Sequence, residues 1–125
     1  VTGAGFFKTS SSTLFDTTLS AANTFQDLDI ATLASISAVD MVCFFQVTYT
    51  FISGSGGNLV MKPKGKGSAT FSLHSAGGSG TADFIPTTTG DIVYMTCVTD
   101  SNGEIEIAAN TTTASYKIEL LGYIK

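Results

Sequence analysis

The chain has 125 residues, of which 43% are hydrophobic and 13% are charged, and its formal net charge at pH 7 is −4. This length suits one domain with a single core. The chain is acidic and contains no arginine, the side chain that best reads phosphate and guanine, so its composition argues against nucleic-acid binding. It has neither an apolar run long enough to span a membrane nor a basic-then-apolar signal peptide, so we expect no membrane partner.

The first eleven residues are polar and contain glycine, apart from the adjacent aromatics Phe6 and Phe7. We interpret residues 1–11 as an N-terminal arm and residues 12–125 as a single β-sandwich domain. Two aromatic rings on an arm need a pocket, either on the same subunit or on a neighbour. We therefore expect Phe6 and Phe7 to take part in assembly.

Short elements follow the arm. Residues 12–18 predict a first strand, and apolar and polar side chains alternate over residues 25–30. Leu33 and Ile36 are three residues apart, which favours a helical turn within residues 31–37.

The segment 41–52 is the most informative part of the chain. Side chains alternate across a strand, and here one face is wholly apolar while the other is apolar at both ends and polar in the middle. A half-buried strand needs only one apolar face, so the second face predicts a covering layer or another copy of the chain. Segment 91–99 is also strongly apolar. We expect the second faces of these two segments to form an assembly surface that contains Val42, Phe44, Ile52, Ile92 and Tyr94.

The remaining strands are short. They are predicted over residues 58–61, 69–74 and 81–85, and loops rich in glycine, serine and threonine separate them. Asn102-Gly103 lies between two alternating segments, which is the strongest short signal for a hairpin, and we expect a type I′ turn there.

The last strand alternates up to the end of the chain. Gly122 within it marks a bulge or a close approach. The pattern places four apolar residues on one face of this strand: Tyr116, Ile118, Leu120 and Ile124. The total of eight or nine strands predicts an all-β antiparallel sandwich, and we expect a jelly-roll-like arrangement because it limits exposed edges.

The basic residues cluster in one segment. Lys62, Lys64 and Lys66 could form an anionic contact site. We favour a solvated loop whose lysines keep a sheet edge from pairing.

The two cysteines, Cys43 and Cys97, lie within apolar strands. We favour two free buried thiols over a disulfide, although neighbouring strands would allow one. Two cysteines and a single histidine do not make a zinc site, and we expect no metal and no cofactor.

Three features are candidates for catalysis or metal binding. His74 is the lone histidine and has no nucleophile elbow near it. Asp27 and Asp29 share a strand face and could serve glycoside hydrolysis, while the oxygen-rich segment 100–104 could hold calcium. We favour structural roles for all three: His74 at the end of a strand, Asp27 and Asp29 on a polar strand face, and segment 100–104 as a turn. We therefore expect that the chain is not an enzyme.

Three segments together carry a resemblance to a known group of proteins. They are AANTFQDLDI over residues 21–30, the long apolar strand and D-S-N-G-E-I-E-I hairpin over 90–107, and YKIELLGYI over 116–124. This pattern resembles small β-sandwich domains of virion surface proteins of tailed bacteriophages and related viruses, including fibre tips and capsid decoration proteins. The resemblance implies a jelly-roll-like fold, frequent trimers and a place on the outside of a virion, but it carries over no site residues. The chain lacks a fibre stalk, which favours a decoration protein or an excised tip.

We therefore expect a non-enzymatic virion surface protein, either a capsid decoration protein or a fibre-tip module. Its expected partners are copies of itself, in a trimer, and other virion proteins. The alternative is a receptor- or carbohydrate-binding tip that contacts a host-surface glycan. The loops rich in serine, threonine, glycine and asparagine at 53–58, 75–80 and 87–90 motivate that alternative.

Overall fold

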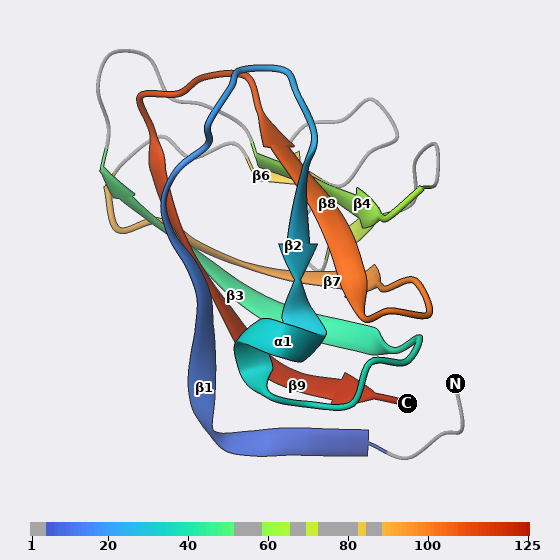
Figure 1. Ribbon diagram of the computed structural model, residues 1–125. Coiled ribbons are helices and arrows are strands. Elements are labelled where there is room, and N and C mark those ends of the chain that lie inside the picture. The colour runs from blue at the N-terminus through green and yellow to red at the C-terminus, as the bar shows by residue number, and fades with distance from the viewer. Residues whose placement is uncertain (1–4, 52–58, 66–69, 73–82, 85–88) are drawn as a thin grey trace.

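The computed structural model describes residues 5–51, 59–65, 70–72, 83–84 and 89–125. Within these ranges the chain forms nine strands and one short helix, arranged as two packed antiparallel sheets (Figure 1). The all-β sandwich predicted from the alternation of apolar and polar side chains is therefore confirmed.

The order of the strands in the sheets defines the topology. The elements are β1 (Gly5–Thr18), β2 (Gln26–Asp29), α1 (Ile30–Ala34), β3 (Val42–Phe51), β4 (Leu59–Pro63), β5 (Thr70–Ser72), β6 (Asp83–Phe84), β7 (Ile92–Val98), β8 (Glu104–Ala109) and β9 (Ser115–Ile124). One sheet has the order β1-β9-β3-β7-β5, and the other has the order β2-β8-β4-β6. Four pairings join opposite halves of the chain: β1 with β9, β2 with β8, β3 with β7 and β4 with β6. This is a long hairpin wrapped into two sheets, the jelly-roll arrangement, and β5 adds an edge strand beside β7.

The core lies between the two sheets, where alternate side chains of each strand point inward. In β3 the inward side chains follow strict alternation, and the outward ones between them are half-buried. Burial of each large apolar side chain contributes roughly 1.5–3 kcal/mol to stability. The largest fully buried side chains are Tyr49, Tyr116, Phe45, Leu19, Ile30, Met41, Leu59, Met61, Met95, Ile105, Ile107 and Ile118.

Strand β1 includes much of the segment that we interpreted as an N-terminal arm. The backbones of Gly5, Phe6 and Phe7 pair with the end of β9, and two register shifts follow before the pairing continues to Thr18. Figure 1 shows the sharp bend that β1 makes along its length. From Gly5 onward this segment is thus an edge strand of the five-stranded sheet.

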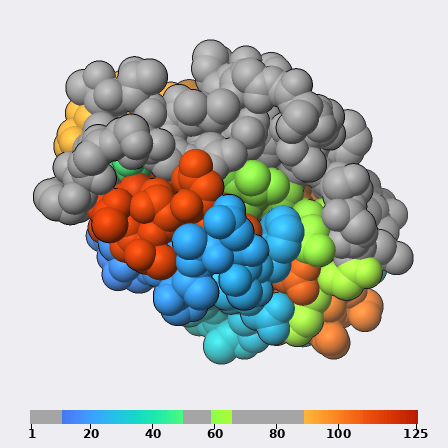
Figure 2. Space-filling view, turned by 90° about the horizontal axis from the view of Figure 1, so that it is seen from above, coloured from blue at the N-terminus to red at the C-terminus, as the bar shows by residue number. Residues whose placement is uncertain are grey.

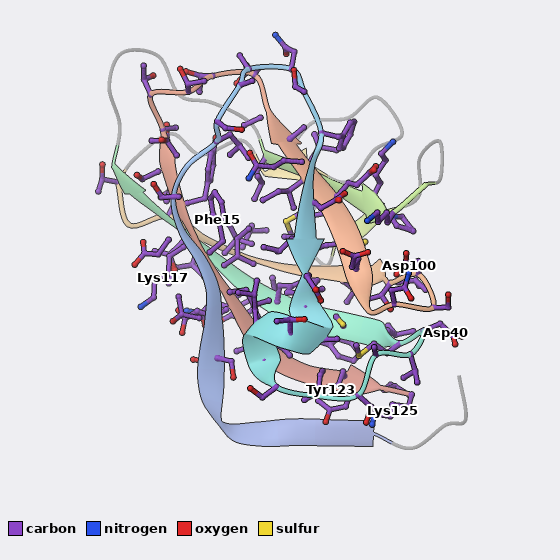
Figure 3. All side chains as sticks on the ribbon, in the orientation of Figure 1. Phe15, Asp40, Asp100, Lys117, Tyr123 and Lys125 are labelled. Atoms are coloured by element: carbon purple, nitrogen blue, oxygen red, sulfur yellow. The ribbon has the colours of Figure 1, made fainter. Side chains whose placement is uncertain are left out.

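A β-bulge near Gly122 reverses the alternation of β9, as the glycine predicted. On β3, Phe45 pairs with Leu120 while its neighbour Phe44 pairs with Gly122, so one residue of β9 is extra. Lys117 therefore points outward, whereas Tyr123, also an odd-numbered position, packs against the core (Figure 3). The prediction that Ile124 shares the face of the buried residues of β9 is wrong, because the bulge moves it beside Val42 on the outer face.

Helix α1 is one turn long, and local capping defines both of its ends. The Asp29 carboxylate accepts hydrogen bonds from the Thr32 backbone nitrogen at 3.1 Å and from the Thr32 hydroxyl at 2.8 Å. Ser35 ends the helix in the left-handed conformation, with φ of 56°. The predicted helical turn is confirmed. The helix covers Ile30–Ala34, so it begins and ends earlier than the predicted range of residues 31–37.

The hairpin between β7 and β8 packs directly against α1. Its turn is closed by Gly103 N donating to Asp100 O at 3.1 Å, and only Gly103 of the turn has positive φ, at 75°. A type I′ turn needs positive φ at both central residues, so that prediction is wrong; this is a type I turn followed by a left-handed glycine. The Asp100 carboxylate accepts hydrogen bonds from the backbone nitrogens of Asn102 and Glu104, which stabilises this alternative.

Thr99 is the buried polar residue that joins this hairpin to the segment before β3. Its hydroxyl accepts a hydrogen bond from Met41 N at 3.1 Å and lies within donating distance of Val39 O and Asp100 O. Figure 3 shows Asp40 and Asp100 on the two neighbouring segments. The threonine hydroxyl thus provides a hydrogen-bond partner for backbone groups that strand pairing does not satisfy where β3 begins and β7 ends.

We expect Thr99→Val to lower the free energy of unfolding by about 2 kcal/mol, because the change keeps the shape and leaves buried backbone groups unsatisfied. Urea unfolding at pH 7 measures the change. Thr48→Val is the matched control, because Thr48 lies half-buried on the outer face of β3 and should change stability by less than about 0.5 kcal/mol. Equal stability of the two variants would contradict the role given to the Thr99 hydroxyl.

Candidate functional site

The outer face of the five-stranded sheet brings together four of the predicted assembly residues. Val42 and Phe44 lie on β3, and Ile92 and Tyr94 lie on the neighbouring strand β7. All four alternate with buried residues, so their side chains are on the side of the sheet away from the core. Ile92 is 51% exposed and Tyr94 is 47% exposed, whereas Val42 and Phe44 are half-buried.

The register arranges this surface in two apolar areas with polar side chains between them. Val42 stands between Val98 of β7 and Ile124 of β9, with Phe44 on the next outward position of β3. Towards the other end of β3, its outward residues are polar. We use "apolar face" for the outward residues Val42, Phe44, Ile92, Tyr94, Val98 and Ile124.

The other three predicted assembly residues are less fully described. The backbone of Phe6 pairs with Tyr123, and that of Phe7 pairs with Gly122, which in turn pairs with Phe44 of β3. Phe7, Gly122 and Phe44 thus form one row across the sheet at the level of the backbone, and the side chains of Phe6 and Phe7 are outside what the structure describes. Ile52 lies outside the described residues.

The outer face of the four-stranded sheet carries ion pairs. Lys62 on β4 lies 3.2 Å from a Glu106 carboxylate oxygen of β8. Lys64, directly after β4, bridges Glu104 at 2.7 Å and Asp27 at 3.0 Å. Hydrogen bonds to Glu104 and then to Asp27 raise the pKa of Lys64.

These pairs correct the interpretation of the lysine segment. Lys62 lies within strand β4, and the side chains of Lys62 and Lys64 are both paired with carboxylates, so these two lysines do not belong to a solvated loop. Their charges are matched by carboxylates across the sheet, which leaves Lys64 compensated by two acids. Lys66 lies outside the described residues.

The candidate catalytic carboxylates are engaged in structural contacts. Asp27 pairs with Lys64, and Asp29 caps α1. Asp100 stabilises the hairpin turn. Within the described part of the chain, no group of three or more histidine, cysteine, aspartate or glutamate residues could hold a metal ion. His74 lies outside the described residues, as do the glycine-rich loops at 53–58 and 75–80.

Cys43 and Cys97 face each other across β3 and β7, and both are free and buried. Thr99 N donates to Met41 O, and Tyr49 N donates to Asp91 O, so the odd-numbered residues of β3 form the hydrogen-bonded pairs of this ladder. Cβ atoms in such a pair are about 5.5 Å apart, more than a relaxed disulfide allows. Register therefore keeps the thiols apart, and the favoured prediction of two free buried thiols is confirmed.

A surface hollow on the four-stranded sheet is the feature that sequence reasoning missed. Its volume is about 240 Å³. Figure 2 shows this end of the molecule, where the segment before β2 lies beside β4. The sequence marked Phe25 only weakly, through the irregular first step of the apolar-polar alternation over residues 25–30. The residues that line the hollow are Asn23, Phe25, Val60, Ala108, Ala109 and Asn110.

No protein-family model, curated protein or solved structure matches this chain. The two outer faces of the sandwich are therefore the features on which a functional hypothesis can be built. Among the described residues, no helix is both long enough and apolar enough to cross a lipid bilayer.

Proposed function

We propose that this chain is a non-enzymatic structural module that forms a homotrimer by burying its apolar face. The observation that carries the proposal is the exposure of Ile92 and Tyr94 on a rigid sheet whose same face also carries Val42 and Phe44 of β3. Large apolar side chains grouped on one surface are a common mark of a protein contact. A tyrosine suits such a surface because its ring can be buried while its hydroxyl stays wet.

The proposed setting is the outer surface of a virion, where the trimer serves as a capsid decoration protein or as a fibre tip. The resemblance of segments 21–30, 90–107 and 116–124 to virion surface domains supports this setting. The jelly-roll topology agrees with that resemblance, although the same fold serves many unrelated functions. Other virion proteins are the further partners in this proposal.

The polar middle of the apolar face has a role in the proposed contact. Gln46 and Thr48 of β3 stand directly beside Tyr94 and Ile92 of β7, and Glu119 and Lys117 of β9 pair with them on their other side. Polar groups near an apolar contact fix orientation and register more than they add affinity. A stable contact of this kind buries at least about 1,000 Å² in total.

We expect the wild-type chain to have a solution mass three times its chain mass of 13.0 kDa, measured by light scattering at tens of micromolar. Ile92→Lys combined with Tyr94→Lys should give the monomer mass, because two charges would then have to be buried in the contact. Both positions are exposed in the single chain, so its thermal unfolding should change little.

Leu33→Lys is the matched control for this experiment. Leu33 is 49% exposed on α1, away from the apolar face, and its replacement makes the same chemical change. The control should remain a trimer. A monomeric wild type, or a double variant that remains trimeric, would contradict the proposal.

A further inference from the structure

The surface hollow exists because a small side chain stands between two large ones. Gln26 pairs with Ile107, which places Phe25 beside Ala108, and Ala108 pairs with Val60 on its other side. These three residues therefore form one row across the outer face of the four-stranded sheet. The methyl group of Ala108 forms the floor, and Phe25 and Val60 form the walls.

One end of the hollow is bounded by two amide side chains. Asn23 and Asn110 are both exposed, and both line the hollow. Asn23 has a φ of 55°, and its backbone nitrogen donates to Ala109 O at 2.8 Å, which ties the segment before β2 to the end of β8. Each amide can donate and accept hydrogen bonds.

Charge near the hollow is compensated. The Lys62 ammonium lies 4.2 Å from the centroid of the Phe25 ring, and it also pairs with Glu106 at 3.2 Å. The lysine thus steadies the aromatic wall while its charge is already matched. An anionic ligand would have to compete with Glu106 for it.

We propose that this hollow binds one ring of a neutral pyranose sugar, such as the terminal residue of a glycan. A sugar ring has an apolar C–H face, which suits the negative face of the Phe25 ring, and a rim of hydroxyls, which suits amides. The volume of about 240 Å³ lies below the range for drug-sized ligands, so it suits a single ring. An apolar side chain of a protein partner could pack against Phe25, but it could form no hydrogen bond with the amide of Asn23 or Asn110.

The experiment uses the whole chain and four defined probes, observed by saturation-transfer NMR. The probes are the methyl β-glycosides of glucose, galactose and N-acetylglucosamine, together with N-acetylneuraminic acid as the anionic comparison. A single ring in an open site should bind with a dissociation constant in the millimolar range. We expect at least one neutral glycoside to bind, with the strongest transfer to its ring C–H protons, and to bind more tightly than the anionic sugar.

Two variants and a matched control locate the binding. Ala108→Leu fills the floor and Phe25→Ala removes a wall, and each should weaken binding at least tenfold; the second variant keeps the test valid if the first does not fold. Ala38→Leu makes the same change at an exposed position in the loop between α1 and β3, and it should bind as the wild type does. The proposal is overturned if no neutral glycoside binds at 20 mM (about the upper end of the millimolar range), if the anionic sugar binds best, or if a folded Ala108→Leu or Phe25→Ala variant binds normally. This site is independent of the apolar face, so a monomeric chain that binds sugar would reject only the proposed trimer.

Discussion

Replacing Gly103 with alanine is expected to lower the free energy of unfolding by about 3 kcal/mol, among the larger effects of a single methyl group. Gly103 has a φ of 75°, which an alanine adopts only with strain. A Cβ atom at this position would also lie 2.6 Å from the Cβ of Ala31 and 3.3 Å from Cε of Met41. The Gly103 carbonyl accepts hydrogen bonds from the backbone nitrogens of Ile30 and Ala31, so the turn cannot move away without losing the start of α1.

Gly65→Ala is the matched control for this prediction. Gly65 has the same φ of 75°, but a Cβ atom there would meet no atom of the described residues within 4 Å. The control should lower the free energy of unfolding by about 1 kcal/mol, from backbone strain alone. Urea unfolding of both variants at pH 7 separates the two causes, and equal losses would show that the close approach of the hairpin to α1 does not limit residue 103.

Stability is also expected to fall steeply between pH 9 and pH 11. Burial raises the pKa of Cys43 from 9.0 to about 12, with the charge of Cys97 adding to the effect, and burial raises the pKa of Cys97 to about 12. Above pH 9 the thiols ionise in the unfolded chain but stay protonated in the folded one. The unfolded state therefore binds fewer protons, and the free energy of unfolding decreases as pH rises through this window.

The expected slope follows from the number of protons. Each thiol contributes about 1.4 kcal/mol per pH unit, so two thiols give about 2.7 kcal/mol per unit between their unfolded and folded pKa values. Burial also raises the pKa of Tyr116, which adds to the slope above pH 10. Below pH 9 all three groups are protonated in both states and contribute no slope.

Urea unfolding at pH 8, 9, 10 and 11 measures this effect. Replacing both Cys43 and Cys97 with alanine should lower stability at pH 8, because it leaves small cavities, and should remove most of the slope between pH 9 and pH 10. Tyr116→Phe should keep the slope below pH 10 and reduce it above. A wild-type stability that is the same at pH 8 and pH 10.5 would contradict burial of the thiols.

Both outer faces of the sandwich depend on pairings between distant residues. The apolar face was accessible to sequence reasoning because Val42, Phe44, Ile92 and Tyr94 occupy alternate positions within two continuous segments. The hollow was not, because Phe25, Ala108 and Val60 come from three separate segments of the chain, and their neighbourhood depends on the register of β2, β8 and β4. Alanine 108 has no local pattern that would mark it as the floor of a site.

The sequence by itself determined that the chain is an all-β sandwich, that segments 41–52 and 91–99 contribute strands with apolar residues on both faces, and that a hairpin joins the strands on either side of Asn102-Gly103. These are local properties, since alternation with a period of two and turn residues act within a few positions. Only the tertiary structure decided the partners: the lysines of β4 with the acids of β2 and β8, Cys43 opposite Cys97, and Ile124 on the outer face. Such contacts depend on register, and one extra residue in a bulge moves every later side chain of a strand to the opposite face.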